Sequence, residues 1–270
     1  MMKAEQSFDE ISIKANMQTK WAGNPVHFVR ETDSTNRWAK DLAKQGAPHG
    51  TLCVADFQSA GRGRLGRQWT APPGSSVMFS LLLRPGLKPE KAPALTLVMG
   101  LSVALAIKAF GYLVSIKWPN DVVINGKKIC GILTEMETMG NEIGYVVIGT
   151  GINVDIRSFP PETQDKATSL ALEGDAVPDR NQVLSKVLGE FEKNFELYEK
   201  RQDLSMLQES YEALLANRDQ PVRVLGKDAS FEGICLGINE SGALKIRTAS
   251  GEIRFVNSGE VSVRGLYSYV

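Results

Sequence analysis

The sequence predicts an α+β protein with a large N-terminal domain and a small C-terminal β-barrel, and two features of the chain support this. Residues 1–217 mix apolar strands with long helices, whereas from about residue 218 the chain changes to short strands separated by tight turns. A chain of 270 residues is long enough for one large and one small domain. We therefore expect a main domain over residues 1–217 and a barrel domain over residues 218–270.

Apolar periodicity, capping residues and glycine stops define the expected elements in chain order. In the main domain we expect strands over residues 26–29, 51–56, 77–83, 113–118, 122–124, 129–137 and 145–153. Helices are expected within residues 8–20 and over 34–46, 94–110, 181–200 and 204–215. Asn125-Gly126 is a strong hairpin signal. The barrel strands are expected over 222–225, 231–238, 243–248, 252–256 and 261–264.

Residues 61–69, with the sequence GRGRLGRQW, predict a mobile loop that wraps an anion. Glycine lets a backbone approach a ligand closely, and guanidinium groups are forked donors for carboxylate or phosphate. The spacing also matches the G-x-G-x-x-G pattern of dinucleotide sites, but the run Pro72-Pro73-Gly74 leaves no room for the helix that such sites require. A flexible surface loop without a ligand is the alternative that this stretch alone leaves open.

Further polar groups stand at the ends of strands. The run 117–121 (KWPND) would bring a cation, an amide and a carboxylate together at a proline turn, although such a run alone is more often a plain turn. Lys127 and Lys128 follow the hairpin turn, and Gly131 permits a close approach to the backbone. The last strand of the sheet ends at Asn153, whose amide suits the edge of a nucleotide base.

Composition excludes several classes of protein. Thirty-one basic and thirty-one acidic residues give no net charge, which argues against a chain-wide nucleic-acid surface. Cys53, Cys130 and Cys235 lie far apart in apolar runs, as expected for reduced core thiols of a cytoplasmic protein. No secretory signal is visible, and the apolar run 93–107 is too short for a membrane span of about 20 residues. His27 and His49 belong to no motif, so we interpret both as structural.

Six motifs in this order and spacing resemble those of biotin protein ligases, and the resemblance covers the chain from about residue 12 to its end. They are residues 33–36 (DSTN), Gln58 with the loop 61–69, residues 117–121, residues 126–133 (GKKICGIL), residues 149–153 (GTGIN) and residues 167–170 (ATSL). The resemblance implies a class II synthetase-like domain, with a mixed and mostly antiparallel sheet flanked by helices, followed by an SH3-like barrel. It implies an enzyme that makes biotinyl-5′-AMP from biotin and ATP with Mg²⁺ and then transfers biotin to a carrier lysine.

The resemblance also implies a role for each residue of the site. The expected biotin-binding residues are Ser34, Thr35, Asn36, Gln58, Arg62, Gly63, Arg64, Lys128 and Gly131. The expected ATP- or AMP-binding residues are Arg64, Arg67, Trp69, Asn120 and Asn153, although Trp69 could instead only anchor the loop. The expected catalytic residues are Arg62, Arg64, Lys117, Asp121 and Lys128, because two anions must be brought together during adenylation. Whether Asp121 accepts a proton or holds a metal stays open, and the metal-site residues are unknown.

The expected partner is the biotin carboxyl carrier domain of acetyl-CoA carboxylase or a related carboxylase. Only about thirty residues precede the first motif, too few for a winged helix-turn-helix, so we expect the monofunctional form without specific DNA binding and without membrane attachment; a homodimer is left open. Three alternatives remain: a lipoate or octanoate ligase of related fold, a nucleic-acid-binding module and, more distantly, a dinucleotide-dependent oxidoreductase.

Overall fold

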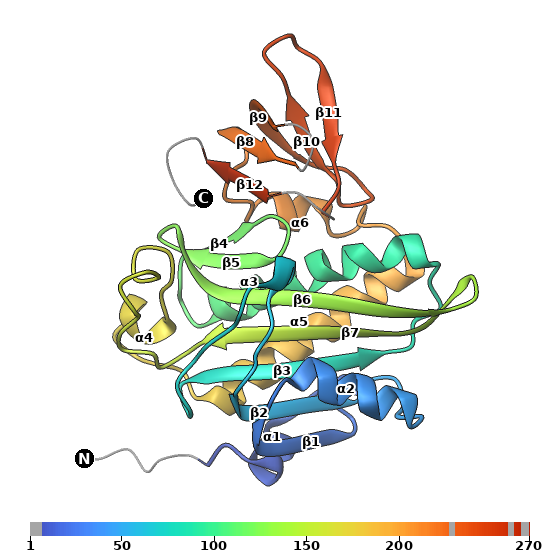
Figure 1. The fold of residues 1–270 in the computed structure, drawn as a ribbon, viewed down its shortest axis with the longest axis vertical. Coiled ribbons are helices and arrows are strands. Elements are labelled where there is room, and N and C mark those ends of the chain that lie inside the picture. The colour runs from blue at the N-terminus through green and yellow to red at the C-terminus, as the bar shows by residue number, and fades with distance from the viewer. Residues whose placement is uncertain (1–6, 227–229, 259–261, 266–269) are drawn as a thin grey trace.

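The main feature of the structure, a computed structural model, is one large sheet with helices on both faces (Figure 1). The structure describes residues 7–226, 230–258, 262–265 and 270. The sheet has seven strands in the order β1-β2-β3-β7-β6-β5-β4. Their bounds are Val26–Thr32 (β1), Leu52–Gln58 (β2), Ser76–Leu83 (β3), Val114–Lys117 (β4), Asp121–Ile124 (β5), Lys127–Met139 (β6) and Glu142–Asn153 (β7).

Only β1 and β2 pair in parallel, and the other neighbours in this sheet pair antiparallel. The prediction of a mixed and mostly antiparallel sheet is therefore confirmed. The turn at Asn125-Gly126 joins β5 to β6 with positive φ at both residues, which explains why glycine and asparagine stand there. Pairing of β3 with β7 brings residues far apart in sequence side by side in the middle of the sheet.

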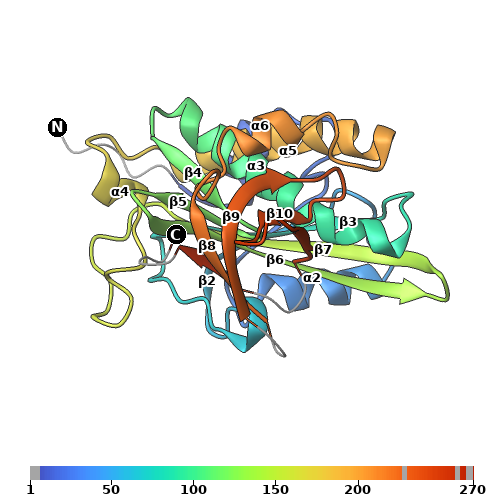
Figure 2. The same ribbon diagram turned by 90° about the horizontal axis from the view of Figure 1, so that it is seen from above.

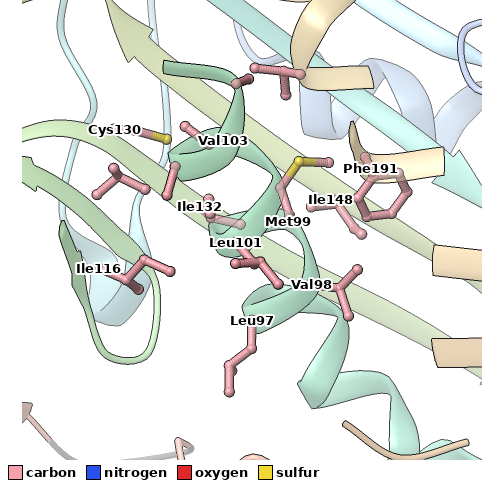
Figure 3. Close-up of a cluster of buried hydrophobic side chains, with 14 of the residues drawn as sticks. Leu97, Val98, Met99, Leu101, Val103, Ile116, Cys130, Ile132, Ile148 and Phe191 are labelled. Atoms are coloured by element: carbon pink, nitrogen blue, oxygen red, sulfur yellow. The ribbon is translucent and has the colours of Figure 1, made fainter. Parts of the chain in front are cut away.

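Two long helices cover one face of the sheet, α3 (Leu95–Ala109) and α5 (Arg180–Arg201). Figure 3 shows Met99 of α3 beside Ile148 of β7 and Phe191 of α5 in the main core. The helical stretch Pro89–Ala109 has 21 residues, so it is longer than the run 93–107 expected from the sequence and is long and apolar enough to span a membrane by length and composition alone. Its mean hydropathy is 1.8 over 18 residues, but 72% of that window is buried inside the protein. This helix therefore has the character of a core helix, as its lack of an amphipathic pattern predicts.

The opposite face carries α2 (Thr35–Lys44), which packs through Ala39 and Ala43 on Cys53, Leu82 and Val147. Side chains alternate along a strand, so Leu82 faces α2 while Leu81 faces the main core. The short helix α1 (Glu10–Asn16) lies within the range predicted for it and begins with a capping box between Asp9 and Ser12. The N-terminus of α2 reaches the middle of the sheet, which places residues 34–36 over β3 and β7.

The helix predicted over 204–215 is wrong in extent, because only α6 (Gln208–Glu212) is α-helical there. Tertiary hydrogen bonds take the ends of this range out of a helix. The amide of Leu204 donates to the carbonyl of Glu240, and the carbonyl of Leu214 accepts from the amide of Ile116 in β4. A short helix, α4 (Leu170–Glu173), was not predicted.

The C-terminal strands form a five-stranded antiparallel sheet in the order β11-β10-β9-β8-β12, above the β4 end of the main sheet in Figure 1 and across it in Figure 2. Their bounds are Pro221–Leu225 (β8), Ser230–Ile238 (β9), Leu244–Arg247 (β10), Ile253–Val256 (β11) and Ser262–Gly265 (β12). All five agree with the predicted strands, except that residue 261 lies outside the described residues. Closure into a barrel is not observed, since no pairing of β11 with β12 occurs in the part of the chain that the structure describes.

Candidate active site

The glycine-arginine loop is folded as a tight turn that crosses the sheet from β2 and β3 toward β5 (Figure 1). The backbones of Arg62 and Gln68 form an isolated antiparallel β-bridge. The amide of Gly63 donates to the carbonyl of Arg67 at 2.7 Å, and the amide of Trp69 donates to the carbonyl of Gly61 at 2.9 Å. At Gly61 a Cβ atom would lie 2.5 Å from the carbonyl oxygen of Trp69, so this position needs glycine. The loop is therefore closed by its own backbone.

A chain of neutral polar groups lies beneath the loop. The Thr35 amide and hydroxyl donate to Gln58 Oε1 at 2.7 and 3.1 Å. The Ser80 hydroxyl lies 2.8 Å from Thr35 Oγ1 and 2.6 Å from Asn36 Oδ1. Ser34, Thr35 and Asn36 are each at most 4% exposed. Buried hydroxyls and amides of this kind suit a neutral polar ligand, because each can exchange an internal partner for one on the ligand.

Three glycines make the floor of the same space. A Cβ atom on Gly149 would lie 1.9 Å from Asn36 Oδ1, and one on Gly151 would lie 2.5 Å from Cε2 of Trp69. Gly131 on the neighbouring strand lies under both Trp69 and the Lys128 ammonium. The absence of side chains at these positions lets the amide of Asn36 and the indole of Trp69 lie directly on the sheet, and their placement depends on it.

Charged groups are linked into one chain beside this floor. The Lys128 ammonium lies 2.7 Å from the Asp121 carboxylate and 5.7 Å from the centre of the Trp69 ring. Asn120 donates to Asp121 Oδ1 at 3.0 Å and accepts from Arg64 Nη1 at 2.8 Å. The second Arg64 nitrogen donates to the backbone carbonyl of Ser258, which follows β11. The loop, the 117–121 turn, the hairpin and the C-terminal sheet thus meet at one point.

Lys117 lines a second space, together with Asp121 and Lys128, and only 6% of its surface is exposed. Burial lowers its pKa to about 7; the nearby Asp121 carboxylate opposes this shift, whereas the positive charges of Arg264, Lys128 and Arg67 add to it. A field of this sign favours the arrival of an anion, which would restore the charged form of the amine.

A cavity unites most of the predicted site residues. It is lined by Ser34, Thr35, Asn36, Gln58, Arg62, Gly63, Arg64, Trp69, Asn120, Lys128, Gly131, Ile132, Leu133 and residues 149–151. A second space beside it is lined by Lys117, Asp121, Arg67 and Arg264, with Arg64, Trp69 and Lys128 common to both. All nine residues expected at biotin therefore lie on the first cavity, and the expected catalytic residues divide between the two.

Asn153 is placed apart from that cavity. Its side-chain amide donates to the carbonyl of Thr168 at 3.0 Å, and it lines a third, more apolar space with Trp69, Phe159 and Ala167. The indole Nε1 of Trp69 is buried and has no hydrogen-bond partner among the described residues, although an indole N–H usually finds one when buried. Trp69 lines all three spaces, so it lies between them as well as holding the loop to the sheet.

Three residues at or beside the site were not singled out from the sequence. Ser80 lies in the middle of the buried strand β3, whose other polar residue is Ser76 at its first position, and a polar residue inside an apolar run was a usable signal. Glu135 on β6 lies 3.7 Å from Arg62 and accepts a hydrogen bond from Asn36 at 2.8 Å. Arg264 comes from β12 in the C-terminal sheet. The last two carry no local signal, because only the folded chain brings them here.

Comparison with known proteins gives consistent results. Residues 28–153 match the biotin/lipoate A/B protein ligase family, and residues 219–264 match the biotin protein ligase C-terminal domain. The bifunctional ligase/repressor BirA of Bacillus subtilis is 38% identical over 97% of this chain and 81% of its own length. The biotin--[acetyl-CoA-carboxylase] ligase of Mycobacterium tuberculosis is 33% identical over 94% of each chain. The biotin protein ligase of Aquifex aeolicus, solved with biotin and ATP, matches 89% of this chain and 98% of its own, at 33% identity and a TM-score of 0.78.

Proposed function

This chain belongs to the biotin/lipoate A/B protein ligase family, and on that premise we propose which of its residues act in each step of the biotin protein ligase reaction. It activates biotin with ATP and transfers biotin to a carrier protein. The observation that carries our assignment of residues is the position of the first cavity: neutral hydroxyls and amides line part of it, whereas Arg64, Trp69 and Lys128 also line the cationic space beside it. The reaction requires the same order of groups, because a neutral ring system, a carboxylate and a triphosphate must lie in a row.

The neutral end of the cavity fits the ureido ring of biotin. Thr35 and Gln58 form a hydrogen-bonded pair there, and the buried side chains of Ser34 and Asn36 lie beside it. Binding of the ureido group can replace part of these internal hydrogen bonds without leaving a buried polar atom unpaired, which is the condition for tight binding of a neutral polar ligand. Arg62 and Gly63 of the loop border the same end.

Lys128, Arg64 and Arg62 are the groups we assign to the first half-reaction. The biotin carboxylate attacks the α-phosphate of ATP, a new C–O–P bond forms, and diphosphate leaves. Two anions meet in this step, so cations must offset their repulsion. Lys128 is already paired with Asp121 at 2.7 Å and is only about a quarter exposed, which supports its role at a fixed point. Asn120 holds Arg64 at 2.8 Å.

The cationic space lined by Lys117, Arg67 and Arg264 fits the leaving phosphates, and the aromatic face of Trp69 with the space toward Asn153 fits the adenine. Mg²⁺ carried by the phosphates would supply further charge neutralisation there. Asp121 is the one carboxylate among the described residues that line this space, so it is the side chain that would contact such an ion.

In the second half-reaction the carrier lysine attacks the acyl carbonyl of biotinyl-5′-AMP, the C–N bond forms and AMP leaves. The attacking amine must be neutral, whereas free lysine is almost wholly protonated at pH 7. Asp121 is buried beside the reaction point and is our proposed acceptor of the proton. Lys117, with its pKa lowered to about 7, is suited to bind phosphate charge when protonated.

The biotin carboxyl carrier domain is the partner, as the named activity of the relatives implies. We propose acetyl-CoA carboxylase or a related carboxylase as its source and the cytoplasm as the location of the reaction. We also propose that residues 1–217 form the catalytic domain and residues 218–270 the second domain, which contributes Arg264 and the Ser258 carbonyl to the site. The absence of specific DNA binding and of membrane attachment stays a prediction, and a homodimer stays open.

Mass spectrometry of the purified protein incubated with biotin and ATP tests the proposal. We expect bound biotinyl-5′-AMP, followed by a biotin-sized mass increase on an added carrier domain. Lipoate and octanoate in place of biotin are the controls for the related acyl ligases. Adenylation of lipoate without adenylation of biotin would overturn the assignment of the polar cavity to the ureido ring.

A further inference from the structure

Glu135 lies just outside the cavity but contacts groups that line it. Its side chain, on β6, is 20% exposed, and the carboxylate accepts hydrogen bonds from Asn36 and Lys40 and faces Arg62 at 3.7 Å. Asn36 and Arg62 both line the cavity. The carboxylate is therefore one step removed from the ligand and can act on it only through these neighbours.

This carboxylate sets the direction of the hydrogen bonds in the cavity, that is, which atom donates and which accepts. Asn36 Nδ2 donates to Glu135 Oε2 at 2.8 Å and to the carbonyl of Leu133 at 3.3 Å. An ionised carboxylate can only accept, so the amide nitrogen of Asn36 must point toward it and Oδ1 must point toward the Ser80 hydroxyl, 2.6 Å away. The orientation of the Asn36 amide is thus fixed by a charge outside the cavity, through the shorter of its two bonds, together with the Leu133 carbonyl.

The consequence extends to the residues that meet the ligand. A hydroxyl has one proton, and Ser80 lies within hydrogen-bond distance of both Asn36 Oδ1 and Thr35 Oγ1. While Asn36 presents its oxygen, the Ser80 proton is held there, so Ser80 Oγ can accept the Thr35 proton and leave Gln58 Oε1 available to an N–H of the ligand. If Asn36 turned over, or if the Ser80 hydroxyl were removed, the Thr35 proton would be held on Gln58 Oε1 instead.

The charge of Glu135 is maintained by its surroundings. Burial works against ionisation, but the hydrogen bonds from Lys40 and Asn36 and the positive charge of Arg62 outweigh it, and the pKa of Glu135 is lowered below its usual value. The contact with Arg62 is long, and that side chain is 55% exposed. Arg62 is thus kept at the mouth of the cavity without being bound firmly.

We propose that Glu135 is a positioning residue for biotin, which orders the hydrogen bonds of Asn36, Ser80 and Thr35 and keeps Arg62 at the mouth of the cavity. This inference rests on the proposed function, because it assigns the cavity to biotin. Lys40, on α2, is the other cation on the carboxylate and has no place on the cavity lining that the structure describes.

The test compares Glu135→Gln with Glu137→Gln. Both residues lie on β6, two positions apart on the same face, but Glu137 accepts a hydrogen bond from the Tyr145 hydroxyl at 3.0 Å, away from the cavity. A glutamine at 135 keeps the size of the side chain, while its amide can donate and so permits Asn36 to turn over. Biotin Kd is measured by titration calorimetry, and KM for ATP by formation of biotinyl-5′-AMP.

We expect Glu135→Gln to raise biotin Kd about tenfold, with KM for ATP within threefold of the unmodified chain, and Glu137→Gln to change neither. A loss of biotin affinity below threefold in Glu135→Gln overturns the proposal, and so does an equal loss in Glu137→Gln or an equal rise in KM for ATP. Failure of the unmodified chain to bind biotin would instead refute the proposed function, so the two failures are distinguishable.

Lys40→Met tests whether Glu135 acts through Asn36 or only through its ion pair with Lys40. The variant removes the ion pair between Lys40 and Glu135 and leaves the hydrogen bond from Asn36 to Glu135. Retained biotin affinity in Lys40→Met supports the proposal, and a loss that matches Glu135→Gln overturns it. Should Glu135→Gln fail to fold, as judged by circular dichroism, Ser80→Ala tests the same order of hydrogen bonds from its other end. An unchanged biotin Kd in Ser80→Ala would then overturn the proposal.

Discussion

The ammonium of Lys128 lies 2.7 Å from the carboxylate of Asp121, across the hairpin formed by β5 and β6. A register shift between Val122 and Val123 sets which residues face each other across that hairpin. The pair holds a positive charge at the point shared by the polar and cationic spaces, where a substrate anion can replace the carboxylate as its partner. The arrangement leads to predictions for the cations of the site.

Lys128→Ala and Arg64→Ala should each lower the rate of biotinyl-5′-AMP formation by roughly 10²- to 10³-fold, the usual effect of removing one group that stabilises developing charge. Lys127→Ala is the matched control, because that neighbouring amine contacts the carbonyl of Gln164 at an exposed position. The rates follow from quenched-flow or mass-detected assays, with circular dichroism to show an intact fold. A rate within threefold of normal in either variant removes that residue from the catalytic role.

Gly151→Ala should weaken ATP binding, because the added Cβ would lie 2.5 Å from the Trp69 ring and displace it. Loss of stacking on an aromatic ring typically costs about 1–3 kcal/mol, so we expect KM for ATP to rise roughly 5- to 150-fold. Gly189→Ala is the control. That glycine lies in α5 with open space around it, and the same change should stabilise the helix. Normal ATP kinetics in Gly151→Ala would argue that Trp69 does not contact the adenine.

Thr150→Val should raise the free energy of unfolding by about 1 kcal/mol, because it removes a buried hydroxyl that has no hydrogen-bond partner in the part of the chain that the structure describes. Thr150 is 3% exposed and lies on the same face of β7 as the core residues Ile148 and Ile152. Thr96→Val makes the same change where the hydroxyl donates to Thr134 at 2.8 Å, and it should instead be destabilising by about 1 kcal/mol. Chemical denaturation measures both, and the account fails if the two variants respond alike.

Nucleotide binding should be accompanied by proton uptake at pH 8. Burial lowers the pKa of Lys117 to about 7, so the amine is mostly neutral at that pH, and an arriving phosphate should return it to the charged form. Calorimetry in two buffers of different ionisation enthalpy measures the uptake, which we expect to approach one proton and to disappear in Lys117→Met. Equal uptake in both chains would assign the proton to another group.

The same residue should make stability depend on pH in the unliganded protein. Because the folded-state pKa of Lys117 is depressed, the unfolded chain binds more protons between about pH 7 and the ordinary lysine pKa of 10.5. The contribution of Lys117 to stability therefore rises with pH across that window. Denaturation between pH 7 and 9 should show this rise in the unmodified chain and a flatter profile in Lys117→Met. Parallel stability profiles in the unmodified chain and in Lys117→Met would contradict a lowered pKa of Lys117.

Local patterns along the chain predicted most of the elements, because periodicity, caps and turns act over a few residues. The Asn125-Gly126 turn, the buried strand 77–83 and the core helix after residue 94 are examples, and each is present in the structure. The second C-terminal helix was predicted too long, because its ends form hydrogen bonds with β4 and with the turn before β10, which no local rule includes. The composition of the glycine-arginine loop predicts an anion site, and this stays a prediction.

The sequence by itself determined the kinds of group available: guanidiniums on a glycine-rich loop, amides and hydroxyls before α2, and lysines after a hairpin. Only the tertiary structure decided which of them meet. Pairing of β3 with β7 puts Ser80 beside Gly149, the hairpin puts Lys128 on Asp121, and the C-terminal sheet brings Arg264 to Lys117. The physical reason is that hydrogen-bond direction and charge act over a few ångströms in space, whereas these residues are separated along the chain.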